Sequence, residues 1–88
     1  MKNPHEDYQE LVEEEDILIN RIATCKETID TVLQTLYDKD GPIHVQTVRD
    51  ILSAVHDVQV KLERELLIVC ANKKLTARDM NHKPSQFT

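Results

Sequence analysis

The sequence predicts an all-α fold, an antiparallel hairpin of two long helices that dimerises into a four-helix bundle. Three observations favour this fold. The 88 residues include one glycine and only 3% aromatic residues, too few turn and strand formers for a β-sandwich or barrel. Apolar residues recur in steps of three and four along two long segments, which is typical of packed helices. The one glycine stands between these segments, where a hairpin needs its turn.

The first helix is predicted over about residues 4–38. Asn3 is a favoured helix cap, Pro4 suits the first helical position, and Glu6 stands where its carboxylate can bond back to the cap. One row of residues then runs along the helix in steps of three and four, and a single carboxylate interrupts it. The row consists of Tyr8, Leu11, Glu15, Leu18, Ile22, Cys25, Ile29, Val32 and Leu36.

A turn is predicted at residues 38–43 and a second helix over about residues 43–72. Gly41 and Pro42 lie among turn formers, and Pro42 disfavours a helical conformation at the residue before it. Beyond Leu75 the apolar spacing fades, so residues 1–75 are predicted to form the hairpin and residues 76–88 a flexible C-terminal tail. The second row consists of Val45, Val48, Leu52, Val55, Gln59, Leu62, Leu66 and Val69.

The predicted register pairs Leu36 with Val45 across the turn. Glu15 would then lie level with Leu66. The charges support the antiparallel arrangement, because it brings the seven acids of residues 6–16 close to the basic end of the second helix.

Cys25 and Cys70 are expected to remain free thiols. The same register separates them by about 21 Å along the helix axis, too far for a disulfide. The N-terminus lacks the apolar stretch of a secretory signal, and the longest apolar run, residues 66–71, is too short to span a membrane. The sequence therefore predicts a cytoplasmic protein.

The apolar residues of the second helix exceed what one neighbouring helix covers. Residues 66–71 are all apolar and surround the helix for more than a full turn. A second copy or a different protein is expected to cover them, with a homodimer as the simplest solution. Leu67 and Ile68 lie off the seam and, together with Ile17 and Val60, are candidates for a second surface. The predicted interface residues are Leu18, Ile22, Ile29, Leu52, Val55, Leu62, Leu66, Leu67, Ile68 and Val69.

Two polar residues, Glu15 and Gln59, occupy positions in the apolar rows. Glu15 would mark fraying of the seam, accept a lysine from a partner, or fix the register. Gln59 would make a register-setting hydrogen bond or extend its amide to water. The sequence leaves these alternatives open.

No catalytic, metal-binding or cofactor-binding pattern is found. The two serines lie outside any nucleophile motif, so the chain is predicted not to be an enzyme. The four histidines have no partner at a ligand spacing on either helix, and no Glu-x-x-His pair is present. The acidic cluster, defined as residues 6–16, is interpreted as a solvated helix face, with a patch for a basic partner or a carboxylate metal site as alternatives.

The leading functional hypothesis is a non-enzymatic protein-interaction module, a small regulator, adaptor or chaperone that acts through self-association and partner binding. One alternative is a small nucleic-acid-associated regulator that uses Lys73, Lys74 and Arg78 on the basic side of the second helix. A second alternative is a helical co-chaperone of a secretion system.

In its layout of two helices, the short acidic chain resembles the Rop-type dimeric bundles and the small enterobacterial regulators of the AriR type. It is also similar to the helical-hairpin co-chaperones of type III secretion. The resemblance is one of shape and covers the two helices, so it implies a self-associating or partner-binding hairpin and assigns no functional residue.

Overall fold

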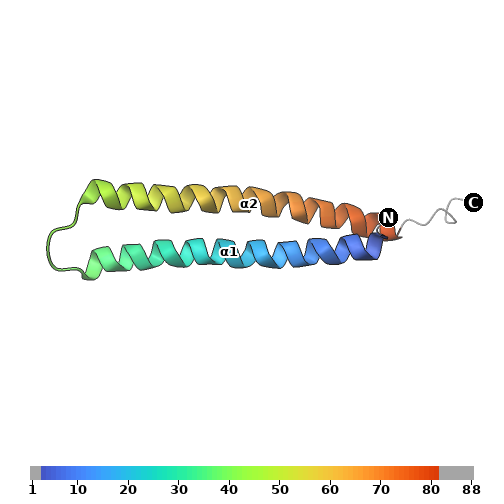
Figure 1. Ribbon diagram of the computed structural model, residues 1–88, viewed down its shortest axis with the longest axis horizontal. Coiled ribbons are helices and arrows are strands. Elements are labelled where there is room, and N and C mark those ends of the chain that lie inside the picture. The colour runs from blue at the N-terminus through green and yellow to red at the C-terminus, as the bar shows by residue number, and fades with distance from the viewer. Residues whose placement is uncertain (1–2, 82–88) are drawn as a thin grey trace, which may run out of the picture.

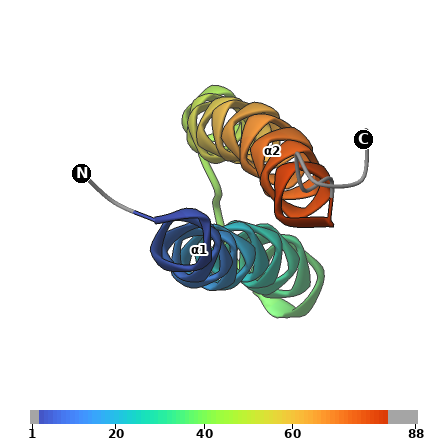
Figure 2. The same cartoon turned by 90° about the vertical axis from the view of Figure 1, so that its right-hand side faces the viewer.

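The computed structural model describes residues 3–81 as a hairpin of two antiparallel helices (Figure 1). Helix α1 spans Pro4–Asp38 and helix α2 spans Val45–Asn81. The helices pack side by side along their length, in a rod of 74 × 21 × 16 Å. Viewed from the end that carries the termini, the fold is a single pair of helices (Figure 2). The all-α hairpin predicted from the sequence is confirmed.

Helix α1 begins at the cap expected from the sequence. The side-chain oxygen of Asn3 accepts a hydrogen bond from the Glu6 amide at 2.9 Å, and its carbonyl accepts from the Asp7 amide at 3.1 Å. Pro4 occupies the first helical position, where its missing N–H costs nothing. At the other end the Lys39 amide donates to the Thr35 carbonyl at 2.9 Å and closes the last turn.

The connection between the helices depends on Gly41, whose φ of 120° lies in the left-handed region that favours glycine. Helix α2 then begins at Val45 rather than at residue 43. The reason is local, since the His44 ring accepts a hydrogen bond from the Thr47 amide at 3.2 Å and caps the helix. Histidine is not among the preferred cap residues, which is why the sequence placed the start earlier.

Helix α2 continues to Asn81, beyond the predicted end at Asn72. The half-buried row persists through Lys73, Thr76 and Met80 in steps of three and four. Two of these residues are polar, so the apolar pattern in the sequence ends before them. The contact of α2 with α1 nevertheless continues. Residues 76–81 are therefore helix where the sequence predicted a flexible tail, and the rest of that tail, 82–88, lies outside the described residues.

The core is the line along which the two predicted rows meet. Ile29, Val32 and Leu36 of α1 are half-buried, as are Val48 and Leu52 of α2. Burial is deepest between the middle of α1 and the C-terminal half of α2. The buried residues there are Leu18, Ile22, Cys25, Leu62 and Val69, and Leu11, Val55 and Leu66 pack against them.

The predicted register is wrong. Val45 is 58% exposed and does not face Leu36, which lines a small pocket with Ile43 and Val48. Glu15 contacts α2 beyond Leu66, at Cys70 and Lys73. Leu36, near the end of α1, lies beside Ile43 and Val48 instead of Val45. Each α1 residue therefore meets a residue of α2 that comes later in the sequence than the predicted partner.

Replacement of Leu62 by alanine is expected to lower the free energy of unfolding by about 2–3 kcal/mol, because this side chain is 2% exposed and its removal leaves a cavity in the core. Leu75→Ala is the matched control, since Leu75 is 53% exposed on the same helix. Its effect should stay within about 0.5 kcal/mol. Urea denaturation followed by circular dichroism measures both, and equal effects would contradict the described core.

Candidate interaction surface

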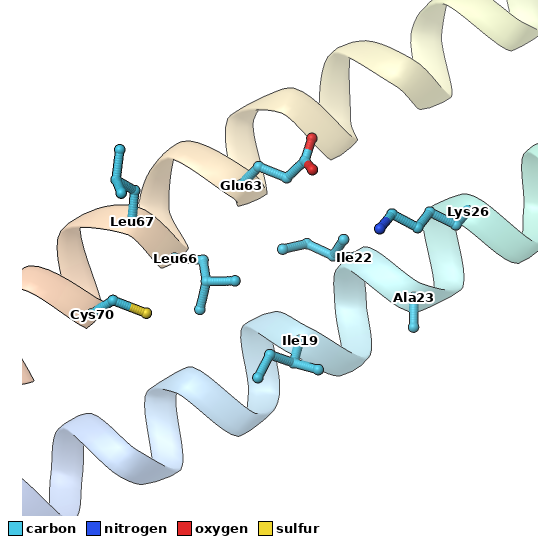
Figure 3. Close-up of a pocket in the computed structure, with 8 residues that line it drawn as sticks. All are labelled: Ile19, Ile22, Ala23, Lys26, Glu63, Leu66, Leu67 and Cys70. Atoms are coloured by element: carbon cyan, nitrogen blue, oxygen red, sulfur yellow. The ribbon is translucent and has the colours of Figure 1, made fainter.

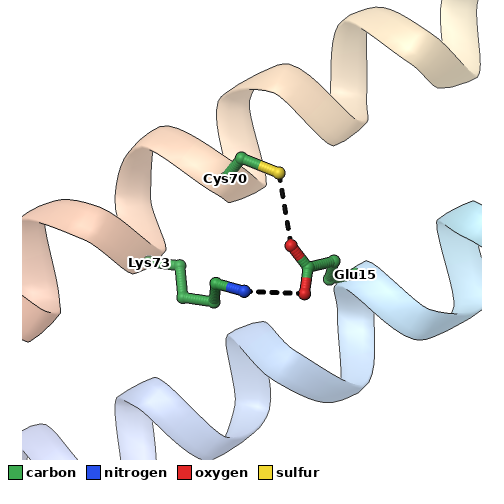
Figure 4. Close-up of polar contacts among 3 residues, drawn as sticks. All are labelled: Glu15, Cys70 and Lys73. Carbon is green, nitrogen blue, oxygen red and sulfur yellow. Dashed lines mark hydrogen bonds and ion pairs between the residues drawn. The ribbon is translucent and has the colours of Figure 1, made fainter.

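A polar cluster of Glu15, Cys70 and Lys73 joins the two helices (Figure 4). The Lys73 ammonium donates to Oε1 of Glu15 at 2.7 Å, and the Cys70 thiol donates to Oε2 at 3.3 Å. The side chains of Glu15 and Lys73 are only 17% and 22% exposed. The lysine that Glu15 accepts therefore belongs to the same chain and not to a partner, and the pair ties the two helices together at one height, as the register-fixing alternative expects.

The cluster stabilises the charged forms of the ion pair. The hydrogen bond from Lys73, followed by that from Cys70, holds the pKa of the Glu15 carboxyl below its ordinary value, although desolvation opposes this shift. The hydrogen bond to Glu15 raises the pKa of Lys73. Stability from the lowered carboxyl is present at neutral pH and is lost as pH falls through the lowered pKa. Stability from the raised ammonium is lost only as pH rises through its own pKa.

The same carboxylate disfavours ionisation of the Cys70 thiol. Its hydrogen bond to Glu15, together with burial, raises the pKa of Cys70 above its ordinary value. Cys25 is buried in the core, and both cysteines are free, as expected from the sequence. Because the thiolate is the reactive form, this shift is expected to lower the reactivity of Cys70.

Beside the cluster, an apolar groove of about 500 Å³ opens between the helices (Figure 3). We call it the first groove. Leu67 and Ile19 are its exposed large apolar residues, at 70% and 47%. Lys26 and Glu63 stand on facing helices at one end of it (Figure 3). The lining residues are Ile19, Ile22, Ala23, Lys26, Glu63, Leu66, Leu67 and Cys70.

A second groove, of about 380 Å³, lies on the other side of the contact line. Ile17 and Ile68 are its exposed apolar residues, at 58% and 57%. Three charged side chains and an asparagine line this groove, against two charged side chains in the first groove, so it is less apolar. The lining residues are Glu14, Ile17, Leu18, Arg21, Glu65, Ile68, Val69 and Asn72.

The structure divides the predicted interface residues into two groups. Most of them hold the hairpin together, because they are buried or half-buried between α1 and α2. Leu67 and Ile68 are instead exposed, one in each groove. The predicted interface residues did not include Ile19 or Ala23, although Ile19 directly follows a row position and so lies at the edge of the apolar stripe. The inward group is Leu18, Ile22, Ile29, Leu52, Val55, Leu62, Leu66 and Val69.

The three predicted nucleic-acid contacts differ in their surroundings. Lys73 is engaged with Glu15, whereas Lys74 and Arg78 are exposed. Among residues 3–81, no group of three or more His, Cys, Asp or Glu side chains is arranged to hold a metal ion. In the same range neither helix has a stretch long and apolar enough to cross a bilayer.

No protein-family model, curated protein or solved structure matches this chain. The candidate surface is therefore identified by its geometry, which is that of an exposed apolar groove between two helices with charges at its end. Such a surface is suited to binding another helix, because ridges of side chains from a third helix fit between two others.

Replacement of Glu15 by glutamine is expected to destabilise the hairpin at pH 7, because Lys73 loses its charged partner. The difference from the wild type should begin to shrink as pH falls below the ordinary pKa of a glutamate, about 4.3, and should be lost once pH falls through the lowered pKa of Glu15. Urea denaturation at pH 7 and pH 3 measures it. Glu14→Gln, an exposed neighbour, is the control and should show no such trend. A difference that stays constant with pH would argue against the ion pair.

Loss of the Glu15 charge is also expected to activate Cys70. In the Cys25→Ala background, the pH profile of alkylation should shift to lower pH in Glu15→Gln, because the carboxylate no longer disfavours the thiolate. The rate of reaction with iodoacetamide between pH 7 and 10 gives the apparent pKa. Identical alkylation profiles with and without Glu15→Gln would show that the pKa of the Cys70 thiol does not depend on Glu15.

Proposed function

We propose that this hairpin is a non-enzymatic protein-interaction module that buries its first groove against another helical pair in a four-helix bundle. The observation that carries the proposal is the exposure of Leu67 and Ile19 on both sides of one apolar groove. Exposed apolar surface that is continuous across two helices is typical of a contact with another protein.

The thinness of the hairpin supports the same proposal. Five apolar residues of the described chain are buried, and each of them lies on the single line between the helices. Small helical domains gain stability when further helices cover the residues beside such a line. A second hairpin would supply two helices at once and convert the exposed groove into the centre of a bundle.

In the cell, the module would serve as a small regulator, adaptor or chaperone, because its apolar groove is suited to binding another protein. Its two free thiols favour a reducing compartment, which supports a cytoplasmic location. The nucleic-acid alternative has less support, because Lys73 is held by Glu15 and the net charge of −5 repels phosphates at long range.

Replacement of Leu67 by glutamate is expected to abolish self-association and the capture of protein partners. A buried, unpaired carboxylate in the bundle centre would be strongly unfavourable, whereas the isolated hairpin keeps Leu67 in water. Leu75→Glu is the matched control. Leu75 is 53% exposed and stands two helical turns beyond Ile68, on the side of the second groove.

Sedimentation equilibrium at micromolar concentration and affinity capture from native cell extract measure the two properties, with helix content from circular dichroism as a check on folding. Leu75→Glu should behave as the wild type. If Leu67→Glu keeps the self-association and the partners of the wild type, the first groove is not the binding surface and the proposal fails.

A further inference from the structure

Four charged residues frame the first groove in an alternating pattern. Lys26 of α1 and Glu63 of α2 line one end. Asp16 stands one heptad before Ala23, and Lys74 one heptad after Leu67, so these two continue the same face beyond the other end. All four side chains are exposed, and within residues 3–81 none of them forms an ion pair.

The charges also lie in two pairs, one near each end of the groove. Lys26 and Glu63 border the same groove, and the Glu15 to Lys73 ion pair fixes the height of their chain neighbours Asp16 and Lys74. The two pairs are separated by about 15 Å on α1 and about 16 Å on α2. Each end of the groove thus carries one positive and one negative charge, with the order of signs reversed between the ends.

Such a pattern is complementary to itself under two-fold rotation. In a symmetric dimer each surface meets its own copy, so a charge must find its opposite on the same surface. Rotation about an axis along the rod keeps every residue at its own height and exchanges the helices. Lys26 would then face Glu63 of the second copy, and Asp16 would face Lys74 of the second copy.

Rotation about an axis perpendicular to the rod also brings opposite charges together at the groove. The charges on the rest of α1, however, disfavour this arrangement. It would place the acidic cluster of α1 against the later half of α1 in the second copy, where Glu27, Asp30 and Asp38 outnumber Lys26. Rotation about the long axis instead places the acidic cluster beside the basic end of α2 in the second copy. Both rotations make every neighbouring helix antiparallel, so the helix dipoles do not distinguish them and the charge distribution decides.

We infer that the occupant of the first groove is a second copy of this chain, packed with α1 against α2 of the second copy and held in register by Asp16–Lys74 and Lys26–Glu63 pairs between the copies. The inference rests on the proposed function and adds the identity of the partner and its orientation. A face of the 74 × 21 Å rod is large enough for the roughly 800 Å² per partner of a stable interface.

Charge exchange within the full chain tests this orientation. Asp16→Lys is expected to weaken the dimer on the order of tenfold, because two attractive contacts per dimer become repulsive. Adding Lys74→Asp should restore the dissociation constant to within about twofold of the wild type. Adding Lys26→Asp to Asp16→Lys should instead weaken the dimer further, because both exchanged charges then face like charges. Sedimentation equilibrium at low ionic strength measures the dissociation constants.

Glu13→Lys is the matched control, since it makes the same charge change at an exposed position of α1 away from both grooves. It should leave the dissociation constant within about twofold of the wild type. Rescue by Lys26→Asp in place of Lys74→Asp would overturn the orientation in favour of α1 against α1. A monomeric wild type with full helix content would overturn the inference that a second copy occupies the groove.

The two proposals fail in different ways. If Leu67→Glu dissociates the dimer while all charge variants match the wild type, the orientation is wrong and the interaction module stands. If the wild type is monomeric but captures partners that Leu67→Glu loses, a different protein occupies the groove and the module again stands.

Discussion

Two helices that pack side by side share one line of contact, and the buried side chains of this hairpin lie on that line. The constraint follows from helix geometry, because only about two positions in each heptad point at a single neighbour. Residues beside the line, such as Ile19 and Leu67, remain exposed however well the line itself packs. The two grooves are consequences of this geometry, and the proposed partner would cover the first of them.

The Glu15 cluster shows how the seam continues where apolar residues end. A carboxylate in such a row is costly unless it is paired and hydrogen-bonded, and Lys73 and Cys70 satisfy both of its oxygens. The long, flexible side chains of Glu15 and Lys73 reach across the space that two apolar residues would fill. This arrangement ties the start of α1 to the C-terminal part of α2 and fixes the height at which the helices meet.

In the proposed dimer, charge gives the first groove its selectivity. Apolar contact has no direction, so a hydrophobic groove by itself accepts helices in either orientation. Exposed charges at its ends contribute little affinity, but they disfavour wrong orientations through like-charge contacts. In the proposed dimer the second groove, with Ile17, Arg21 and Ile68, would remain on the outer surface of each copy.

The sequence by itself determined the helices, the turn at Gly41 and the residues of the contact line, because these depend on local spacing and on single residues with strong conformational preferences. It did not determine the start of α2, since the His44 cap has no sequence signature. The end of α2 was hidden for a different reason, because Lys73 and Thr76 interrupt the apolar pattern. Only the tertiary structure decided the register and the Glu15 to Lys73 pair. Several offsets join two such apolar rows equally well, and the side chains of the two helices must meet in space before one offset is selected.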